Sequence, residues 1–285
     1  MKADVERKAK TFDPNGTTKH LVDEGLIKLQ SFRKQYPFVE DQTSIEKLTA
    51  EDILKKDTGK MGDFFRYIEH QLKPLGHLEI KGTTVYRNII KQLDDFKELL
   101  RMTVDKNRSL AEKIDAPWKD IKRLGLDQHV AKKIIFCFNY ETNKVVPIFK
   151  TQDIEYFLDK INEKQEYPLL YDNKSLGEKY EYLTEQILKA KQESEITNSW
   201  EITYFCRFLY ESYPPPKTIT EPQRKTTITS VDTEEIKQKR EFMDLLNELR
   251  RQYKISAEQL REYRDAGFKD PQARITLTEK LTKLK

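Results

Sequence analysis

Apolar residues recur at helical spacing along most of the chain. Between residues 18 and 36 they fall at Leu21, Val22, Leu26, Leu29 and Phe32, and a proline follows the segment. A repeat at every third or fourth position is typical of an amphipathic helix, and proline ends one. Similar patterns predict helices over 48–56, 62–78, 83–104, 109–115, 131–140, 150–161, 175–193 and 199–213. Only 141–147 includes a short extended piece, so the pattern predicts an all-α fold.

Several of these segments begin with a recognisable N-cap. A Ser or Thr followed three residues later by an acid caps the first backbone N–H groups of a helix. The chain has this pattern at Thr49–Asp52, Ser109–Glu112 and Ser175–Glu178. Thr151 and Ser256 are expected to cap the helices that follow them. The segment 83–104 is expected to form the longest amphipathic helix.

Composition divides the chain into four parts. Residues 1–18 form a polar lead, and residues 19–213 carry the multi-helix domain. The triple proline at 214–216 opens a Thr- and Pro-rich linker, residues 214–235. Such a composition favours an extended segment. Residues 236–285 form a small helical tail that begins with a helical hairpin, and its small size predicts a protein partner.

The bulk composition excludes several classes. No run approaches the roughly 20 apolar residues of a membrane span. The charged start MKADVERKAK has no apolar stretch after it, so a cytoplasmic, soluble protein is expected. Cys137 and Cys206 lie in apolar runs and are expected to be buried and reduced. No motif for a metal or cofactor is present, and none is expected.

The positive charge is placed unevenly. Residues 217–285 carry 16 Lys and Arg against 12 Asp and Glu, which accounts for the whole net charge of +4. Within the otherwise neutral remainder, residues 101–135 hold nine Lys and Arg against five acids. This local surplus surrounds the sequence KRLGLDQHVAKKII at 122–135. Local positive charge is a feature of surfaces that contact nucleic acid.

The segment 122–135 has the form of a helix–hairpin–helix. Gly125 takes the place of the first turn glycine, Leu126 that of the apolar plug, Ala131 that of the small helix contact, and Ile134 points to the core. Bare N–H groups at the second helix start then face a phosphate. Asp127 stands where the second glycine usually sits, and it is also a normal helix cap. An ordinary capped helix is therefore the alternative interpretation.

The downstream course resembles the helix–hairpin–helix DNA glycosylase superfamily. In that family a buried helix, a turn and a Pro-apolar-apolar-Asp-Thr segment follow the hairpin. Here Pro147, Ile148 and Phe149 lead into Lys150 and Thr151, and another apolar helix begins. The likeness extends over residues 20–213. It implies an all-α, glycosylase-like domain containing the hairpin, with a short helical unit at the C-terminus.

The family's catalytic residues are not kept at the matching positions. Its aspartate, which supports positive charge on the sugar, falls at Lys150, and its nucleophilic lysine falls at His129. A cation cannot stabilise a cation-like transition state. Lys150, His129 and Asp127 remain the candidates for any catalysis.

The resemblance also indicates which side chains contact nucleic acid. Trp118 is the candidate for stacking on a base, but a core position is the favoured interpretation of this residue. The expected nucleic-acid contacts are Lys122, Arg123, Gly125, Leu126, Asp127, Gln128, His129, Lys132 and Lys133. A solvated helix face is the alternative explanation for these lysines.

Three functions follow from these patterns. The first is a DNA-binding protein on a glycosylase-like scaffold without glycosylase chemistry, for DNA repair or for recognising modified DNA in restriction. The second is an active DNA glycosylase or AP lyase with displaced catalytic groups. The third is a protein-interaction module with no nucleic-acid role, in which Asp127 is only a cap.

Overall fold

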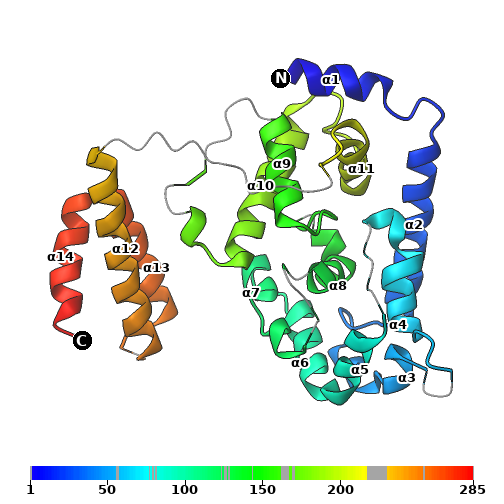
Figure 1. Ribbon diagram of the computed structural model, residues 1–285, viewed down its shortest axis with the longest axis horizontal. Coiled ribbons are helices and arrows are strands. Elements are labelled where there is room, and N and C mark those ends of the chain that lie inside the picture. Colours follow the sequence, from blue (N-terminus) through cyan, green and yellow to red (C-terminus); the bar gives the residue numbers. More distant parts are fainter. Residues whose placement is uncertain are drawn as a thin grey trace. The chain divides into compact units, whose positions relative to one another are not determined.

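The structure is a computed structural model, and among the residues it describes it is all-α (Figure 1). It describes the chain except residues 1, 56–57, 77, 79, 81, 123, 125–126, 128, 143, 162–166, 169–170, 217–229, 253 and 285. For residues 2–3, 230–237, 240, 251 and 257 only the backbone is described. The predicted all-α class is confirmed, because no strand occurs in the described ranges.

The α-helices are α1 (Lys2–Thr11), α2 (Thr17–Gln35), α3 (Ala50–Ile53), α4 (Asp63–Arg66), α5 (Thr84–Lys91), α6 (Leu93–Val104), α7 (Leu110–Ile114), α8 (His129–Asn139), α9 (Thr151–Ile161), α10 (Leu176–Glu193), α11 (Ile202–Ser212), α12 (Ser230–Arg251), α13 (Ala257–Lys269) and α14 (Pro271–Thr282). A π-helical turn, η2 (Tyr67–Gln71), continues α4, and two 3-10 turns used below are η3 (Lys73–Leu75) and η4 (Trp118–Asp120). The helices α1–α11 form one compact unit and α12–α14 a second.

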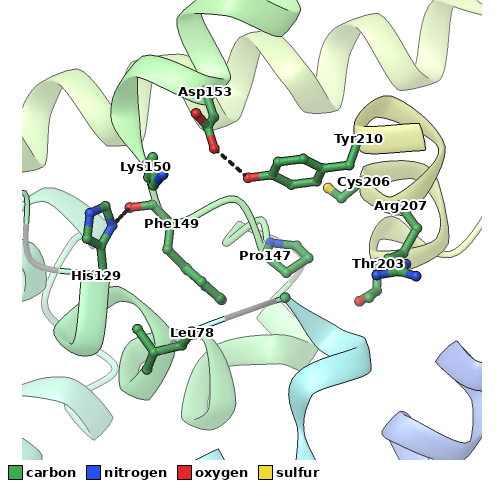
Figure 2. A pocket seen from close by; sticks show the side chains of 11 residues that line it. Leu78, His129, Pro147, Phe149, Lys150, Asp153, Thr203, Cys206, Arg207 and Tyr210 are labelled. Atoms are coloured by element: carbon green, nitrogen blue, oxygen red, sulfur yellow. Dashed lines mark hydrogen bonds between the residues drawn. The ribbon is translucent and has the colours of Figure 1, made fainter. Parts of the chain in front are cut away.

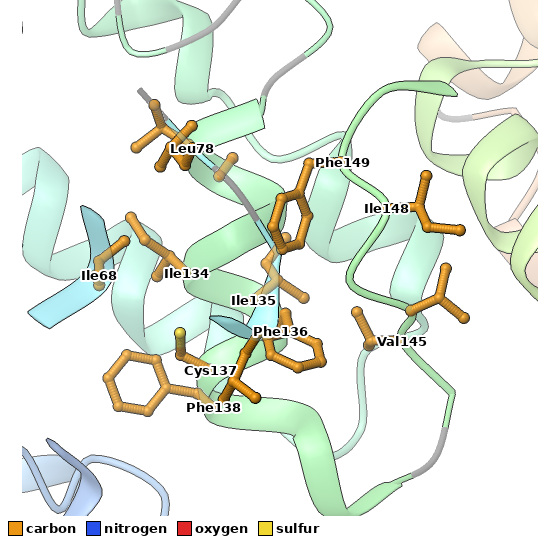
Figure 3. Packing of buried hydrophobic residues seen from close by; sticks show 14 of the residues in the cluster. Ile68, Leu78, Ile134, Ile135, Phe136, Cys137, Phe138, Val145, Ile148 and Phe149 are labelled. Carbon is orange, nitrogen blue, oxygen red and sulfur yellow. The ribbon is translucent and has the colours of Figure 1, made fainter. Parts of the chain in front are cut away.

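Helix α8 lies in the core of the first unit. Its side chains from Ile134 to Phe138 are all buried, on every side of the helix (Figure 3). A helix that is apolar all round is typical of a protein interior. Phe136 packs edge-on against Phe149 from the segment after α8, and Phe138 packs against Phe32 of α2. Ala131 and Ile134 are fully buried, as the sequence predicts.

The predicted capping boxes are present. The Ser109 hydroxyl accepts from the Glu112 N–H, and the Glu112 carboxylate accepts from the Ser109 N–H. The same exchange occurs at Ser175 with its acid three residues on, and Asp52 accepts from the N–H of Thr49. Ser256 caps α13 as predicted.

The longest predicted helix and the polar lead are among the local predictions that differ from the structure. The 83–104 segment forms two helices, α5 and α6, because the backbone of Gln92 leaves the helical region. The side-chain amide of Gln92 donates to the Asp120 carbonyl. The polar lead contains helix α1, with Val5 and Ala9 buried. Asp13, with a φ of +50°, then caps α2 by accepting from two backbone N–H groups. Part of the lead therefore packs on the first unit.

The second unit has a small core of its own. It is built from Phe242, Leu246 and Leu249 of α12, Ile255 between α12 and α13, and Leu281 of α14, and partly buried residues of α13 pack against it. Helix α12 begins at Ser230, so the last residues of the expected linker are helical, while residues 217–229 of that linker lie outside the described residues. None of the described helices combines the length and the apolar character needed to cross a membrane.

Candidate functional site

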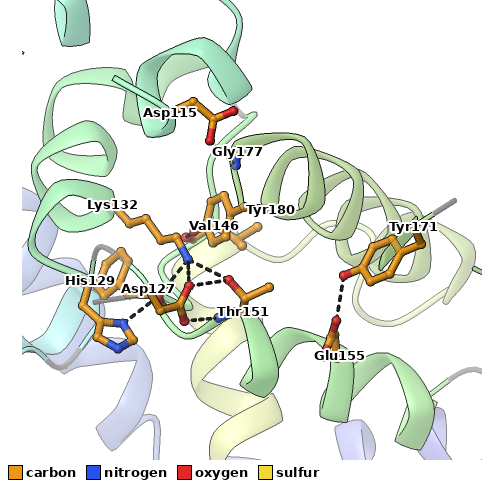
Figure 4. A network of polar contacts seen from close by, with 11 residues as sticks. Asp115, Asp127, His129, Lys132, Val146, Thr151, Glu155, Tyr171, Gly177 and Tyr180 are labelled. Atoms are coloured by element: carbon orange, nitrogen blue, oxygen red, sulfur yellow. Dashed lines mark hydrogen bonds and ion pairs between the residues drawn. The ribbon is translucent and has the colours of Figure 1, made fainter. Parts of the chain in front are cut away.

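Asp127 joins the start of α8 to the start of α9 (Figure 4). Its backbone is left-handed, with a φ of +48°, a conformation that Asp tolerates better than most side chains. One carboxylate oxygen accepts from the Thr151 N–H at 3.0 Å, and the other accepts from the Thr151 hydroxyl at 2.7 Å and from Lys132 Nζ at 2.8 Å. The prediction that Thr151 caps α9 is therefore wrong. Thr151 is the first residue of that helix, and the side chain of Asp127 accepts from its N–H instead.

Lys132 and Lys133 occupy the protein interior. Both side chains are fully buried. Lys132 bonds Asp127 and Thr151, and its ammonium lies 4.4 Å from the centre of the Tyr180 ring. Burial lowers the pKa of Lys132, and the neighbouring Asp127 partly opposes that shift. The expectation that these lysines contact phosphates is wrong, because neither ammonium reaches solvent.

Lys133 holds the end of the segment that follows α4. Its ammonium donates to the carbonyls of Leu72, Leu75 and Gly76 at 2.6, 3.0 and 2.9 Å. Burial lowers its pKa to about 8, so it remains mainly protonated at neutral pH. All three of its N–H donors thereby serve backbone carbonyls of this turn, of which that of Leu72 also accepts from the Leu75 N–H.

The other predicted contacts have different outcomes. Trp118 is fully buried and donates from Nε1 to the Lys113 carbonyl, so it belongs to the core and cannot stack on a base. Lys122 is exposed, and its backbone carbonyl accepts from the side chain of Asn88. Arg123, Gly125, Leu126 and Gln128 lie outside the described residues, so the hairpin stays a prediction.

A cavity of about 520 Å³ opens beside the start of α9 (Figure 2). Ligand sites typically have volumes of about 300–1,000 Å³. The walls come from the ends of η3 and α8, from the segment leading into α9, and from α11. The lining residues are Gly76, Leu78, His129, Pro147, Phe149, Lys150, Asp153, Thr203, Cys206, Arg207 and Tyr210.

Gly76 allows the cavity wall to close. Its φ is +107°, and a Cβ on this residue would lie 2.6 Å from the Phe149 ring and 2.9 Å from the Pro147 carbonyl. Any other side chain would therefore clash and strain the backbone. Because Lys133 bonds the Gly76 carbonyl, the buried lysine also fixes this wall.

Asp153 is the buried carboxylate of the cavity. It is 6% exposed, and Tyr210 of α11 donates to its Oδ2 at 2.9 Å. Burial raises the pKa of Asp153, while the Tyr210 hydrogen bond and the nearby Lys150 and His129 lower it. Burial and Asp153 also raise the pKa of Tyr210, so its phenol stays a hydrogen-bond donor. Perturbed carboxylates in cavities mark candidate functional sites.

His129 and Lys150, the candidates for catalysis named from the sequence, both line this cavity. His129 Nδ1 lies 2.8 Å from the Phe149 carbonyl, which only accepts, so Nδ1 carries the proton in this contact. Lys150 is exposed at the residue before α9. The structure thus brings the imidazole and the ammonium to one place.

The α11 side of the cavity was not predicted. Arg207 is 36% exposed and pairs with Glu211 at 3.2 Å. Thr203 is fully buried, and within the described part of the chain its hydroxyl has no hydrogen-bond partner. Burial raises the pKa of the Cys206 thiol well above its usual value, so it remains protonated.

No family model, curated protein or solved structure matches the chain. The chemistry therefore follows from the cavity itself. Asp153 offers acceptors, Lys150 and Arg207 offer positive charge, and Phe149 and Tyr210 offer flat apolar rings. Among the described residues, no three His, Cys, Asp or Glu side chains gather as metal ligands. The arrangement suits a flat, hydrogen-bonding ligand with a negative group.

Proposed function

We propose that this chain binds nucleic acid, with DNA the first candidate, and takes one unstacked nucleotide into the cavity beside α9. The observation that carries the proposal is the cavity, which combines Lys150 and Arg207 with a buried acceptor, Asp153, and aromatic walls. Proteins that act on a single base extrude it, stack it on aromatic side chains and bond its polar edge. Lys150 and Arg207 would contact phosphates.

A second observation supports the hairpin part of the proposal. Asp127 is left-handed at the position where the resembled motif has its second glycine. Its carboxylate faces Thr151 and Lys132, so its charge is neutralised rather than presented to a phosphate. The residues proposed to contact phosphates are therefore the exposed Lys122 and the cavity residues Lys150 and Arg207, in place of Lys132 and Lys133.

Binding of labelled single- and double-stranded DNA tests the proposal. Affinity should fall steeply between about 50 and about 200 mM salt, because each phosphate contact releases counterions. Lys150→Gln with Arg207→Gln should weaken binding about uniformly across sequences and reduce the salt slope by about 2. Lys19→Gln with Arg66→Gln removes the same charge from exposed positions away from the cavity and should change little. Absence of binding at low salt would refute the proposal and favour a protein-interaction module.

A displaced DNA glycosylase or lyase is the second candidate. Asp153 lies one helical turn beyond the position expected for the catalytic aspartate and shares the cavity with the Lys150 amine. That amine would condense with the aldehyde of an abasic sugar, releasing water and forming an imine that borohydride reduces to a stable crosslink. Loss of the crosslink in Lys150→Gln would assign the amine. An enzyme without lyase activity would instead release a base.

A further inference from the structure

The open side of Asp153 defines what the cavity accepts. Tyr210 occupies Oδ2, and no described residue donates a hydrogen bond to Oδ1. The carboxylate is nearly buried yet lines the cavity, so its remaining acceptor capacity faces a ligand. An ionised carboxylate only accepts hydrogen bonds. A matching ligand must therefore present N–H or O–H donors there.

Thr203 gives an independent indication of a ligand. Thr203 lines the same cavity from α11 (Figure 2), and its buried hydroxyl has no hydrogen-bond partner within the described part of the chain. Burying a hydroxyl without a partner costs free energy. A polar atom of a bound molecule would satisfy it.

The remaining walls favour a planar ring. Phe149 and Tyr210 present aromatic side chains to the cavity, and Pro147 adds a flat apolar surface. Lys150 and Arg207 bring positive charge to the same walls. A ring that carries an anionic group meets both features.

We propose that the cavity binds a guanine-type nucleotide, with the base edge on Asp153 and the phosphate toward Lys150 and Arg207. Guanine presents two adjacent donors, the ring N–H and the exocyclic amino group. One can bond the open Oδ1 of Asp153, and the other can bond the second lone pair of Oδ2 beside the Tyr210 hydroxyl. Adenine and cytosine place a ring acceptor beside their amino donor, and thymine and uracil flank their one N–H with two carbonyls, so each would set a lone pair against the carboxylate. A free nucleotide and a guanine within nucleic acid share this chemistry, and only the second rests on the proposed function.

Calorimetric titration of the full chain with nucleoside monophosphates tests the site. Guanosine monophosphate should bind tightest, inosine monophosphate, which lacks the amino group, about 10-fold weaker, and adenosine monophosphate about 10- to 100-fold weaker. Asp153→Asn should abolish this preference for guanosine monophosphate. Asp23→Asn, at an exposed position of α2, should preserve it. Thr203→Val should weaken all three without changing their order. Equal binding of the three nucleotides, or no binding, would overturn the inference for free ligands.

Single-stranded oligonucleotides that contain one guanine or one inosine distinguish binding of a free nucleotide from binding of a guanine within nucleic acid. A guanine preference that Asp153→Asn removes would support the inference within nucleic acid. Binding of free guanosine monophosphate without any oligonucleotide binding would leave the guanine site standing and refute the proposed nucleic-acid function. Oligonucleotide binding that ignores both the base and the Asp153→Asn change would overturn the guanine site and leave the proposed function standing.

Discussion

Two groups of polar side chains near the start of α9 differ in how fully their hydrogen-bonding capacity is satisfied. The Asp127 carboxylate has partners on both oxygens, in Thr151 and Lys132. The cavity beside it holds Asp153, with one oxygen open to a ligand, and Thr203, whose hydroxyl has no partner in the described structure. A satisfied buried network stabilises a fold, whereas an unsatisfied one costs stability and is kept where a ligand completes it. The difference assigns structure to the first region and binding to the second.

The largest effect is expected at Lys133. Replacing it with Met removes the donor that serves the carbonyls of Leu72, Leu75 and Gly76. The Leu72 carbonyl keeps the Leu75 N–H, so two carbonyls lose their described partner. Each unsatisfied buried group costs about 1–3 kcal/mol, so the free energy of unfolding should fall by about 2–6 kcal/mol. Chemical denaturation measures this loss. Lys122→Met, at an exposed position, should stay within about 0.5 kcal/mol. A loss below about 1 kcal/mol would mean that the Lys133 ammonium does not stabilise the fold.

The next effect is the coupling between Asp127 and Lys132. Asp127→Ala leaves a buried ammonium without its countercharge and should cost about 1–3 kcal/mol, less than at a fully buried pair because the Asp127 side chain is 29% exposed. A double-mutant cycle with Lys132→Met should give a coupling energy of about 1–3 kcal/mol. The exposed pair Lys19–Asp23 provides the control, with a coupling of about 0.5 kcal/mol or less. Additive effects of the two substitutions would mean that the α8–α9 junction does not depend on this ion pair.

A smaller effect of opposite sign is expected at Thr203. Thr203→Val removes the unpartnered hydroxyl and should raise the free energy of unfolding by about 1 kcal/mol. The matched control is Thr103, equally buried, whose hydroxyl donates to the Leu99 carbonyl at 2.9 Å. Thr103→Val should lose about 1 kcal/mol instead. If both variants lose stability alike, Thr203 is satisfied in solution and does not await a ligand.

The sequence predicts the helices better than the site because helices follow local patterns. The capping box at Ser109 and the buried Ile134 follow from neighbours in the chain. The burial of Lys132 and Lys133 also had a signal, because a helix with apolar residues on every side leaves no solvated face for lysines.

The cavity had no such local signal. It joins Gly76, Asp153 and Thr203 from three distant segments. In the sequence, Asp153 has the form of an acid in the first turn of a helix, where it would favour the helix dipole. Only the packing of α11 against α9 distinguishes it from a solvated acid.

Asp153→Asn tests most directly whether the cavity, rather than the α8 lysines, is the functional region. Asn keeps an acceptor for Tyr210 but does not ionise. Burial raises the pKa of Asp153 in the native state, and the opposing effects of Tyr210, Lys150 and His129 are smaller. The Asp153 carboxyl therefore ionises at a lower pH in the unfolded chain than in the native state. The native state loses stability as the pH rises from 3.8 to the native pKa.

The stability and guanosine monophosphate affinity of this variant are measured together. The variant should be more stable than the natural protein at about pH 8, by about 1 kcal/mol as is usual when a strained functional group is removed. The gain should shrink as the pH falls below the native pKa toward 3.8, and the affinity should fall. A variant that is less stable at pH 8 and binds as before would contradict the assignment, because Asp153 would then be a structural residue.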